Sequence, residues 1–330
     1  MDPITLQPVD EVRVTVLMDN TFDALLVGDE HTTRTGFGPA TTAAGQFETG
    51  HTAVGLLVEH GFSALVTVRR DDRETMLLFD AGLSPSGLVT NADRLGIGLG
   101  NLQGVVLSNG HFDHAGGLGG LARRLGDARM PMVVHPHAWT RRRLHTPQST
   151  FDMPTLSKRA LNAEGFEVVE RSQPSLLVDR SVLITGEVDR TTDFEHGMPA
   201  AHQAWRGDHW EHDPRVVDDQ ALVVHLKGRG LVVLTGCGHA GVINVVRHAQ
   251  ADRRAVPPRP AGRLPSDGPR LRTRHRSHGQ RTHGLRPASH RPGALHRLAG
   301  PARPAAAMPD AWAAGSSGTT HRLASQASAL

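Results

Sequence analysis

One short stretch of the chain gathers side chains that bind metal ions. Two histidines and one aspartate lie within four residues, at His111, Asp113 and His114, and two glycines follow shortly after. Neutral imidazole is a good ligand for zinc or iron, and a neighbouring carboxylate adds a hard oxygen ligand and a negative charge. The cluster indicates a divalent metal site. A histidine-containing turn without metal is the alternative that the same residues leave open.

The flanking residues predict that this cluster lies on a loop between a strand and a helix. Residues 105–107 are Val-Val-Leu, which favours a buried strand, and residues 108–110 are Ser-Asn-Gly, which favours a turn. Residues 117–125 have the apolar spacing of a helix. A loop held between two packed elements can direct several side chains at one point.

The stretch from residue 107 to 118 resembles the H-x-H-x-D-H signature of the metallo-β-lactamase superfamily, in its dihydropterin-synthase-like branch of metal-dependent hydrolases. The resemblance implies that Asp113 and His114 hold one metal, and that His111 shares another with the first signature position and a later histidine. Asn109 stands at that first position. An amide oxygen is a poorer zinc ligand than imidazole, so we expect Asn109 to weaken this site.

A second motif, 128 residues further on, repeats the order of strand, glycine-rich turn and helix start. Residues 235–241 read Thr-Gly-Cys-Gly-His-Ala-Gly and are similar to the Gly-Cys-x-His-Ala-Gly motif of the same family. The resemblance implies that His239 is the later histidine of the first metal site. Cys237 is interpreted as a packed thiol rather than a ligand or nucleophile.

Two further acidic positions follow predicted strands. Asp80-Ala81-Gly82 resembles the Asp-x-Gly element of the superfamily, whose carboxylate supports the metal-binding histidines, and a cap of a turn is the alternative reading. The pair Asp19-Asn20 follows the first strand; the resemblance implies that it lies at the mouth of the site, and a simple turn is the alternative.

The order of the predicted elements indicates the fold. Two half-chains each contain strands followed by helices, and each delivers metal ligands from loops at one edge, so we predict an α/β four-layer αββα sandwich over residues 1–250. Residues 28–53 and 186–210 are expected to be long loops. The first could cover substrate, as the resemblance implies, or be a surface excursion, and the second could face substrate or simply be solvated. Other strands are predicted at residues 12–17, 60–68, 76–80, 132–135, 176–178, 182–185, 221–226 and 231–234. Helices are predicted at residues 88–95, 138–144 and 241–250, and residues 156–171 should contain a helix followed by a strand.

Composition limits the compartment and the partners. The chain has 330 residues and one cysteine, Cys237, so it forms no internal disulfide and fits a reducing compartment. No run of about 18 apolar residues occurs, and no basic-then-apolar signal segment follows Met1. We therefore expect a cytoplasmic protein without a membrane partner.

Residues 251–303 differ in character from the rest. From Arg253 to Arg303 there are thirteen arginines, eight prolines and one acid, Asp267, so this stretch carries +12 while the whole chain carries only +3. It has no apolar periodicity, and we expect it to be disordered or poorly packed. Arg, Pro, Ala, Gly, His and Ser are what GC-rich DNA encodes out of frame, which favours a pair of compensating frameshifts. Residues 304–330 would then be a short C-terminal remnant.

The metal ligands indicate the function. We expect a metal-dependent hydrolase, or a related transferase, in which Asp113 orients a water activated by one or two zinc ions, with iron or manganese as other candidates, on a small ester or phosphorylated substrate. A catalytically impaired remnant of the same fold is one alternative, because Asn109 replaces a ligand. Nucleic-acid binding by residues 251–303 is another, less favoured because aromatic residues for base stacking are absent there.

Overall fold

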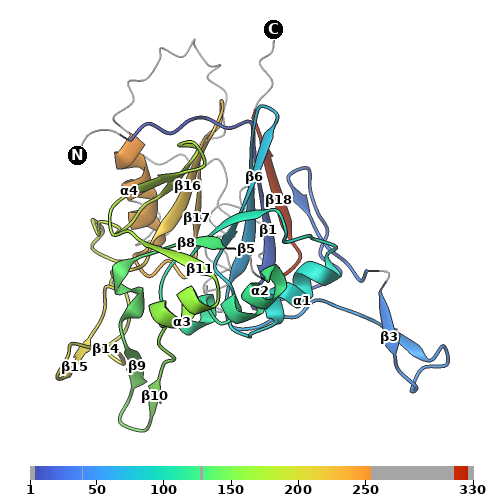
Figure 1. Ribbon diagram of the computed structural model, residues 1–330, viewed down its shortest axis with the longest axis horizontal. Coiled ribbons are helices and arrows are strands. Elements are labelled where there is room, and N and C mark those ends of the chain that lie inside the picture. The colour runs from blue at the N-terminus through green and yellow to red at the C-terminus, as the bar shows by residue number, and fades with distance from the viewer. Residues whose placement is uncertain (1–3, 39, 127–128, 254–315, 326–330) are drawn as a thin grey trace.

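The computed structural model describes residues 4–38, 40–126, 129–253 and 316–325. Two β-sheets pack against each other, and helices cover the outer face of each sheet (Figure 1). The larger sheet has eight strands, in the order β11 (Phe166–Glu170), β8 (Met130–Val134), β7 (Leu102–Val106), β6 (Arg73–Phe79), β5 (Ser63–Arg70), β1 (Glu11–Met18), β18 (Thr320–Ala324) and β2 (Thr32–Thr33).

The smaller sheet and the helices complete the layers. The second sheet has four strands, in the order β12 (Ser175–Leu177), β13 (Val182–Ile184), β16 (Ala221–Leu226) and β17 (Gly230–Thr235). The helices are α1 (Gly87–Arg94), α2 (Leu118–Leu125), α3 (Lys158–Ala163) and α4 (Val242–Arg253). In Figure 1, α4 lies beside β16 and β17, on the opposite side of the molecule from α1 and α2.

Alternation along the strands explains why the two sheets stack. Successive side chains of a strand point to opposite faces, so β5 contributes to two cores. Leu65 packs in the cluster that contains Leu88 of α1 and Leu121 of α2. Its neighbour Val66 packs in the cluster between the sheets, with Ile184 of β13.

The smaller sheet uses the same alternation. Val224 of β16 belongs to the core between the sheets, whereas Val223 packs with Ala249 of α4 on the outer face. The layers are therefore helix, sheet, sheet and helix, and the predicted αββα sandwich is confirmed.

Parallel strands in the larger sheet decide where the loops meet. β6, β7, β8 and β11 run parallel to one another as neighbours. The carboxyl ends of parallel strands lie at one edge of a sheet, where ligands bind in open α/β sheets. Asp80 directly follows β6, and the loop that begins at Leu107 directly follows β7. The sheet thus brings the predicted ligand loop next to Asp80.

Two excursions leave the sandwich. The segment 28–53, expected as a loop, contains β2 and the hairpin β3 (Thr41–Ala43) and β4 (His51–Ala53), which projects from the body in Figure 1. The segment 186–210, also expected as a loop, contains β14 (His202–Trp205) and the first residue of β15 (Trp210–His212). β14 and β15 form a third sheet, in the order β10-β9-β14-β15, with β9 (Arg142–His145) and β10 (Thr150–Asp152).

The prediction of a helix at residues 138–144 is wrong. A short 3-10 turn, Pro136–Trp139, precedes strand β9 there. β9 pairs with β14, which is about sixty residues away in the chain: His202 pairs with Leu144, and Ala204 pairs with Arg142. Local propensity favours a helix at these residues, but this long-range pairing overrides it.

Among the described residues, no helix combines the length and the apolar character needed to cross a bilayer. β18 adds Thr320–Ala324 to the larger sheet, next to β1. The predicted boundary at residue 250 falls inside α4, and residues 254–315, which include nearly all of the segment expected to be out of frame, lie outside the described residues. The division into three parts stays a prediction.

Candidate metal centre

Three turns from distant parts of the chain meet at the edge of the larger sheet. Gln220 of the segment before β16 donates its backbone N–H to the carbonyl of Ser108, at 2.8 Å. Gly236, directly after β17, lies so close that a Cβ there would be 2.2 Å from Ser108 Oγ and 2.8 Å from Asp80 Oδ2. Only glycine allows this approach, which brings the turn after β17 against the loop after β7.

Asp80 fixes the loop after β7 and one of its histidines. Asp80 Oδ1 accepts from the backbone N–H of Ser108 at 2.6 Å, and Oδ2 accepts from Ser108 Oγ at 2.7 Å. The Nδ1 atom of His114 lies 2.7 Å from Asp80 Oδ2. A carboxylate only accepts, so Nδ1 of His114 carries the hydrogen and donates it. This is the contact that the Asp-x-Gly resemblance implies for Asp80.

His114 also meets the only cysteine of the chain. The Nε2 atom of His114 lies 2.7 Å from Cys237 Sγ and 3.6 Å from Asp113 Oδ2. One ligand atom each from Asp113, His114 and Cys237 can be chosen so that all three lie within 4.8 Å of one another. Sequence reasoning interpreted Cys237 as a packed thiol, whereas its sulfur lies in a group of side chains that could hold a metal ion.

The carboxylates of this group favour a cation. Burial alone would lower the pKa of His114, but Asp80 and Asp113 beside it raise that pKa well above the ordinary value. Burial raises the pKa of Cys237 to about 12. A metal would replace both protons, because metal ligands bind as neutral imidazole and thiolate.

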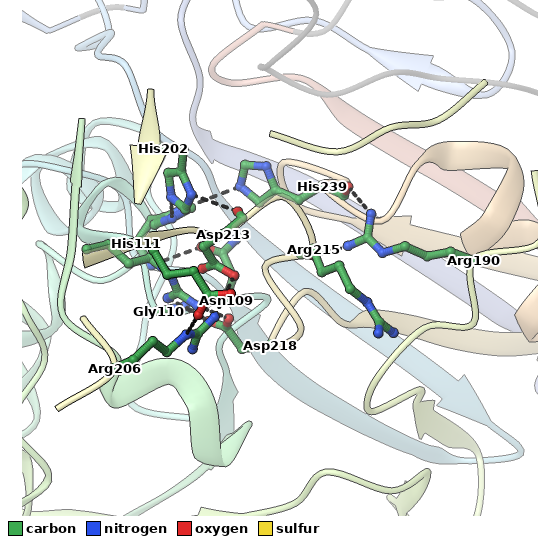
Figure 2. Close-up of polar contacts among 12 residues, drawn as sticks. Asn109, Gly110, His111, Arg190, His202, Arg206, Asp213, Arg215, Asp218 and His239 are labelled. Carbon is green, nitrogen blue, oxygen red and sulfur yellow. Dashed lines mark hydrogen bonds and ion pairs between the residues drawn. The ribbon is translucent and has the colours of Figure 1, made fainter. Parts of the chain in front are cut away.

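A second group contains three histidine rings. His111 Nδ1 lies 3.1 Å from His239 Nε2, and His111 Nε2 lies 3.0 Å from His202 Nε2 (Figure 2). Burial lowers the pKa of His111 and of His239 well below the ordinary value, with neighbouring histidines adding to the effect. Both rings are therefore neutral at pH 7, the form that binds metals.

The distance between His111 and His239 fits two ligands of one ion. Two nitrogens bound to a tetrahedral zinc at about 2.05 Å lie roughly 3.3 Å apart. His111 Nδ1 and His239 Nε2 are 3.1 Å apart, which is close to this spacing. The structure thus brings together His111 and His239, which the sequence assigned to one site from two turns 128 residues apart.

Asn109 uses its amide within the loop. Its Oδ1 atom accepts from the backbone N–H of His111 at 2.9 Å, and its Nδ2 atom donates to Ser108 Oγ at 3.0 Å. The side chain is buried and shapes the turn. Asn109 stands at the first position of the signature, and its Oδ1 atom, which could be offered to a metal, is already used within the loop.

Two arginines hold the backbone around the histidines. Arg190 donates from Nη1 to the carbonyl of His239 at 2.8 Å (Figure 2). Arg142, from β9, is buried between Asp213 and Asp218, and Asp218 Oδ2 accepts from the backbone N–H of Gly110 at 2.8 Å. The ligand loop is therefore anchored to β9 and to the segment before β16.

A cavity of about 280 Å³ opens beside these turns. It is lined by Cys237, Gly238, His239 and Gly241, together with residues 195–198. The sequence expected the loop 186–210 to face substrate, and part of that loop lines this cavity. A larger hollow of about 510 Å³ lies away from the histidines, beside Glu74 and Asn101.

Sequence reasoning missed three residues of this centre. His202 was one of several histidines in a loop without a recognisable motif, and Arg142 lay in the stretch expected to be a helix. His60 is two-thirds exposed, and its Nε2 atom lies 3.6 Å from Asp113 Oδ2. No local pattern distinguishes these residues, because each reaches the centre through long-range pairing or packing.

Comparisons with known proteins agree with this geometry. The family model described as the metallo-beta-lactamase superfamily matches residues 58–253. The 7,8-dihydropterin-6-methyl-4-(beta-D-ribofuranosyl)-aminobenzene-5'-phosphate synthase of Methanocaldococcus jannaschii is 22% identical over 193 residues, which cover 57% of this chain and 64% of that protein. An uncharacterised protein of the same organism is 28% identical over 193 residues, which cover 58% of this chain and 68% of that protein. The chain thus spans less than two thirds of the synthase.

A solved structure supports the fold. A protein described as a metal-dependent hydrolase of the beta-lactamase superfamily has a TM-score of 0.50 and 22% sequence identity, covering 73% of this chain and 71% of that one. At this identity the likeness concerns the fold alone. Because the family model covers more than half of the chain, including both histidine turns, the chain belongs to the metallo-beta-lactamase superfamily, whose members bind divalent metals.

Proposed function

We propose that this protein is a metal-dependent hydrolase acting on a small ester or phosphorylated substrate. The observation that carries the proposal is the pair His111 Nδ1 and His239 Nε2, two neutral nitrogens 3.1 Å apart, the first on a buried ring and the second on a half-buried one. A first divalent ion, zinc or else iron or manganese, would be held there. A second would be held by Asp113, His114 and Cys237.

In the proposed hydrolysis the metal, Asp113 and His60 have different roles. A divalent metal in such a site lowers the pKa of water and polarises the group to be cleaved. The carboxylate of Asp113 would accept a hydrogen bond from the attacking water and orient it. His60 lies 3.6 Å from that carboxylate on the exposed side, where it can donate a proton to a leaving group.

The substrate class rests on the cavity and on the relative. A space of about 280 Å³ beside His239 suits a small molecule. The name of the Methanocaldococcus jannaschii relative describes a synthase whose product carries a phosphate. By likeness to it, we infer phosphate esters as the first substrates to test, and carboxylic esters as the second.

The test compares turnover and metal content in the same samples. The purified full chain would be loaded with zinc, iron or manganese and assayed with p-nitrophenyl phosphate, bis(p-nitrophenyl) phosphate and p-nitrophenyl acetate. We expect His239→Ala to lower both bound metal and kcat/KM by about 100-fold or more, as loss of a metal ligand does. His145→Ala changes an exposed histidine of β9 outside the centre and should leave both unchanged.

An impaired remnant of the fold is the second candidate, and one observation favours it: the Asn109 amide is used within its own loop. Wild-type protein that binds no metal and turns over none of the three substrates would support the remnant. Nucleic-acid binding by residues 251–303 is less favoured because aromatic residues for base stacking are absent there. It stays a prediction, because nearly all of that segment lies outside the described residues.

A further inference from the structure

His202 lies behind His111, on the side away from His239. It comes from β14, in the small third sheet, and its side chain is fully buried. Its Nδ1 atom is 3.0 Å from the backbone carbonyl of Asp213, and its Nε2 atom is 3.0 Å from Nε2 of His111 (Figure 2). The two rings are nearly perpendicular, at 81°.

The donor and the acceptor can be assigned in each contact from Asp213 through His202 to His111. A carbonyl oxygen only accepts, so His202 Nδ1 carries a hydrogen and donates it to Asp213. Burial disfavours a charged imidazole, and a neutral ring has a single N–H. Nε2 of His202 is then an acceptor. The hydrogen shared with His111 must therefore sit on Nε2 of His111.

The lone pair of His111 is consequently on Nδ1. That atom is the one that lies 3.1 Å from His239 Nε2, on the side where the proposed metal would bind. His202 is not placed to be a ligand of that ion, because its Nε2 atom faces the opposite nitrogen of His111.

We propose that His202 is the positioning residue for His111: it fixes the tautomer in which Nδ1 binds the metal and holds the ring in that orientation. This inference rests on the proposed metal centre. Partners that fix the tautomer of a ligating histidine typically change metal affinity by about 10- to 100-fold when they are removed.

A buried arginine connects this contact to the backbone of the ligand loop. Arg142 Nε donates to Asp213 Oδ2 at 3.1 Å, and its Nη1 donates to Asp218 Oδ2 at 3.2 Å. Asp218 accepts from the N–H of Gly110, the neighbour of His111. The ring of His111 and the backbone beside it are thus both fixed through one arginine of β9. Arg142 and His202 both come from the third sheet, so this sheet supports the centre although its strands are far from His111 in the chain.

The first experiment measures zinc affinity in the purified full chain by competition with a chromophoric chelator. His202→Leu removes the acceptor and should weaken zinc binding by about 10- to 100-fold. His202→Gln is the matched control, because its Oε1 atom can accept from His111 Nε2. We expect it to recover most of the affinity. Zinc binding by His202→Leu within twofold of wild type would overturn the proposal.

The second experiment needs no metal and no variant at position 202. Imidazole ¹⁵N–¹H correlations of metal-free wild-type protein report the tautomer of each histidine, and His111→Ala identifies the signals of His111. We expect the hydrogen on Nε2. A hydrogen on Nδ1, or rapid averaging of the two forms, would overturn the role of His202 even if His202→Leu fails to fold. Wild-type protein that binds no zinc but shows the Nε2 tautomer would defeat the proposed metal centre, and with it the positioning role of His202, while the tautomer of His111 would be as inferred.

Discussion

At the scale of single residues, Asn109 shows how this chain departs from the signature it resembles. Its amide bridges Ser108 and His111 within the loop, so it stabilises the turn instead of offering a third imidazole. The proposed site of His111 and His239 would therefore have fewer strong ligands than the three usual in catalytic zinc sites. We accordingly expect weak retention of the first metal.

Replacing Asn109 by histidine tests whether the missing imidazole weakens metal binding. Asn109→His should raise the zinc retained per chain after dialysis, because imidazole is a better zinc ligand than an amide. Asn109→Ala is the control, since it removes the same turn contacts without adding a ligand. Elemental analysis of the dialysed proteins measures the outcome. No gain in zinc for Asn109→His would mean that the site lacks more than this one ligand.

Asp19 provides a prediction on pH. It is almost fully buried after β1, and burial raises its pKa from 3.8 to about 6. A raised carboxyl pKa contributes stability below about pH 4, and that contribution is lost as the pH rises through 6. Asp19→Asn should thus be more stable than wild type at pH 8 by about 2 to 3 kcal/mol, with the difference vanishing near pH 4.

Urea unfolding at pH 4, 6 and 8 measures this difference. Asp72→Asn, the same substitution at an exposed position, is the control. A difference for Asp19→Asn that stays constant from pH 4 to 8 would contradict the assignment of a buried, raised carboxyl.

The residues that sequence reasoning found are those that lie inside local motifs. His111, Asp113, His114 and His239 each stand in a short pattern whose neighbours predict strand, turn and helix. His202 stands in no such pattern, because its contact with His111 joins positions 91 residues apart. Long-range contacts of this kind depend on how strands pair, and spacing along the chain does not encode them.

At the scale of elements, the ends of β6, β7 and β17 build the centre, and Gly236 sets how closely they approach. A methyl group there would meet Ser108 Oγ at 2.2 Å, in the network that holds Asp80 and His114. Gly236→Ala should lower the free energy of unfolding by about 1 to 3 kcal/mol, as overpacking does, and should reduce bound metal.

Gly98→Ala is the matched control for this variant. A Cβ at residue 98 would meet nothing within 4 Å, so its free energy of unfolding should change by less than about 0.5 kcal/mol. Chemical denaturation and metal analysis of both variants provide the measurement. Equal effects of the two substitutions would show that the close approach at Gly236 is not needed.

The sequence predicted the strands and helices of the sandwich, but the prediction was wrong in the third sheet, at residues 138–144. Strands such as β1 and β5 could be predicted because they are rich in apolar and β-branched residues, and these residues are buried in the structure. The stretch 138–144 could not, because β9 is stabilised by pairing with β14 and by the ion pairs of Arg142. Propensity is a weak guide where such tertiary contacts decide the outcome.

At the scale of the whole molecule, the C-terminal strand joins the first one. β18 pairs antiparallel with β1 over five residues, and Figure 1 shows it in red beside β1. Gly318 also donates its N–H to the carbonyl of Val16. Thr320–Ala324 are therefore part of the larger sheet, although they follow the basic segment in the chain.

Removing this strand should destabilise the protein. A chain that ends at residue 315 leaves one edge of β1 without its partner, and we expect the free energy of unfolding to fall by about 3 to 5 kcal/mol, at roughly 1 kcal/mol for each lost ladder bond. A chain that ends at residue 325 keeps β18 and serves as the control. Thermal unfolding of both proteins is the measurement. Equal melting temperatures would contradict the pairing.

The central claim is that two turns 128 residues apart hold one divalent ion between His111 and His239. Anomalous diffraction at the zinc edge, from crystals of the full chain grown with zinc, tests it most directly. We expect a peak about 2.0 to 2.1 Å from both His111 Nδ1 and His239 Nε2. Zinc found only elsewhere in the molecule, or no zinc at all, would contradict it.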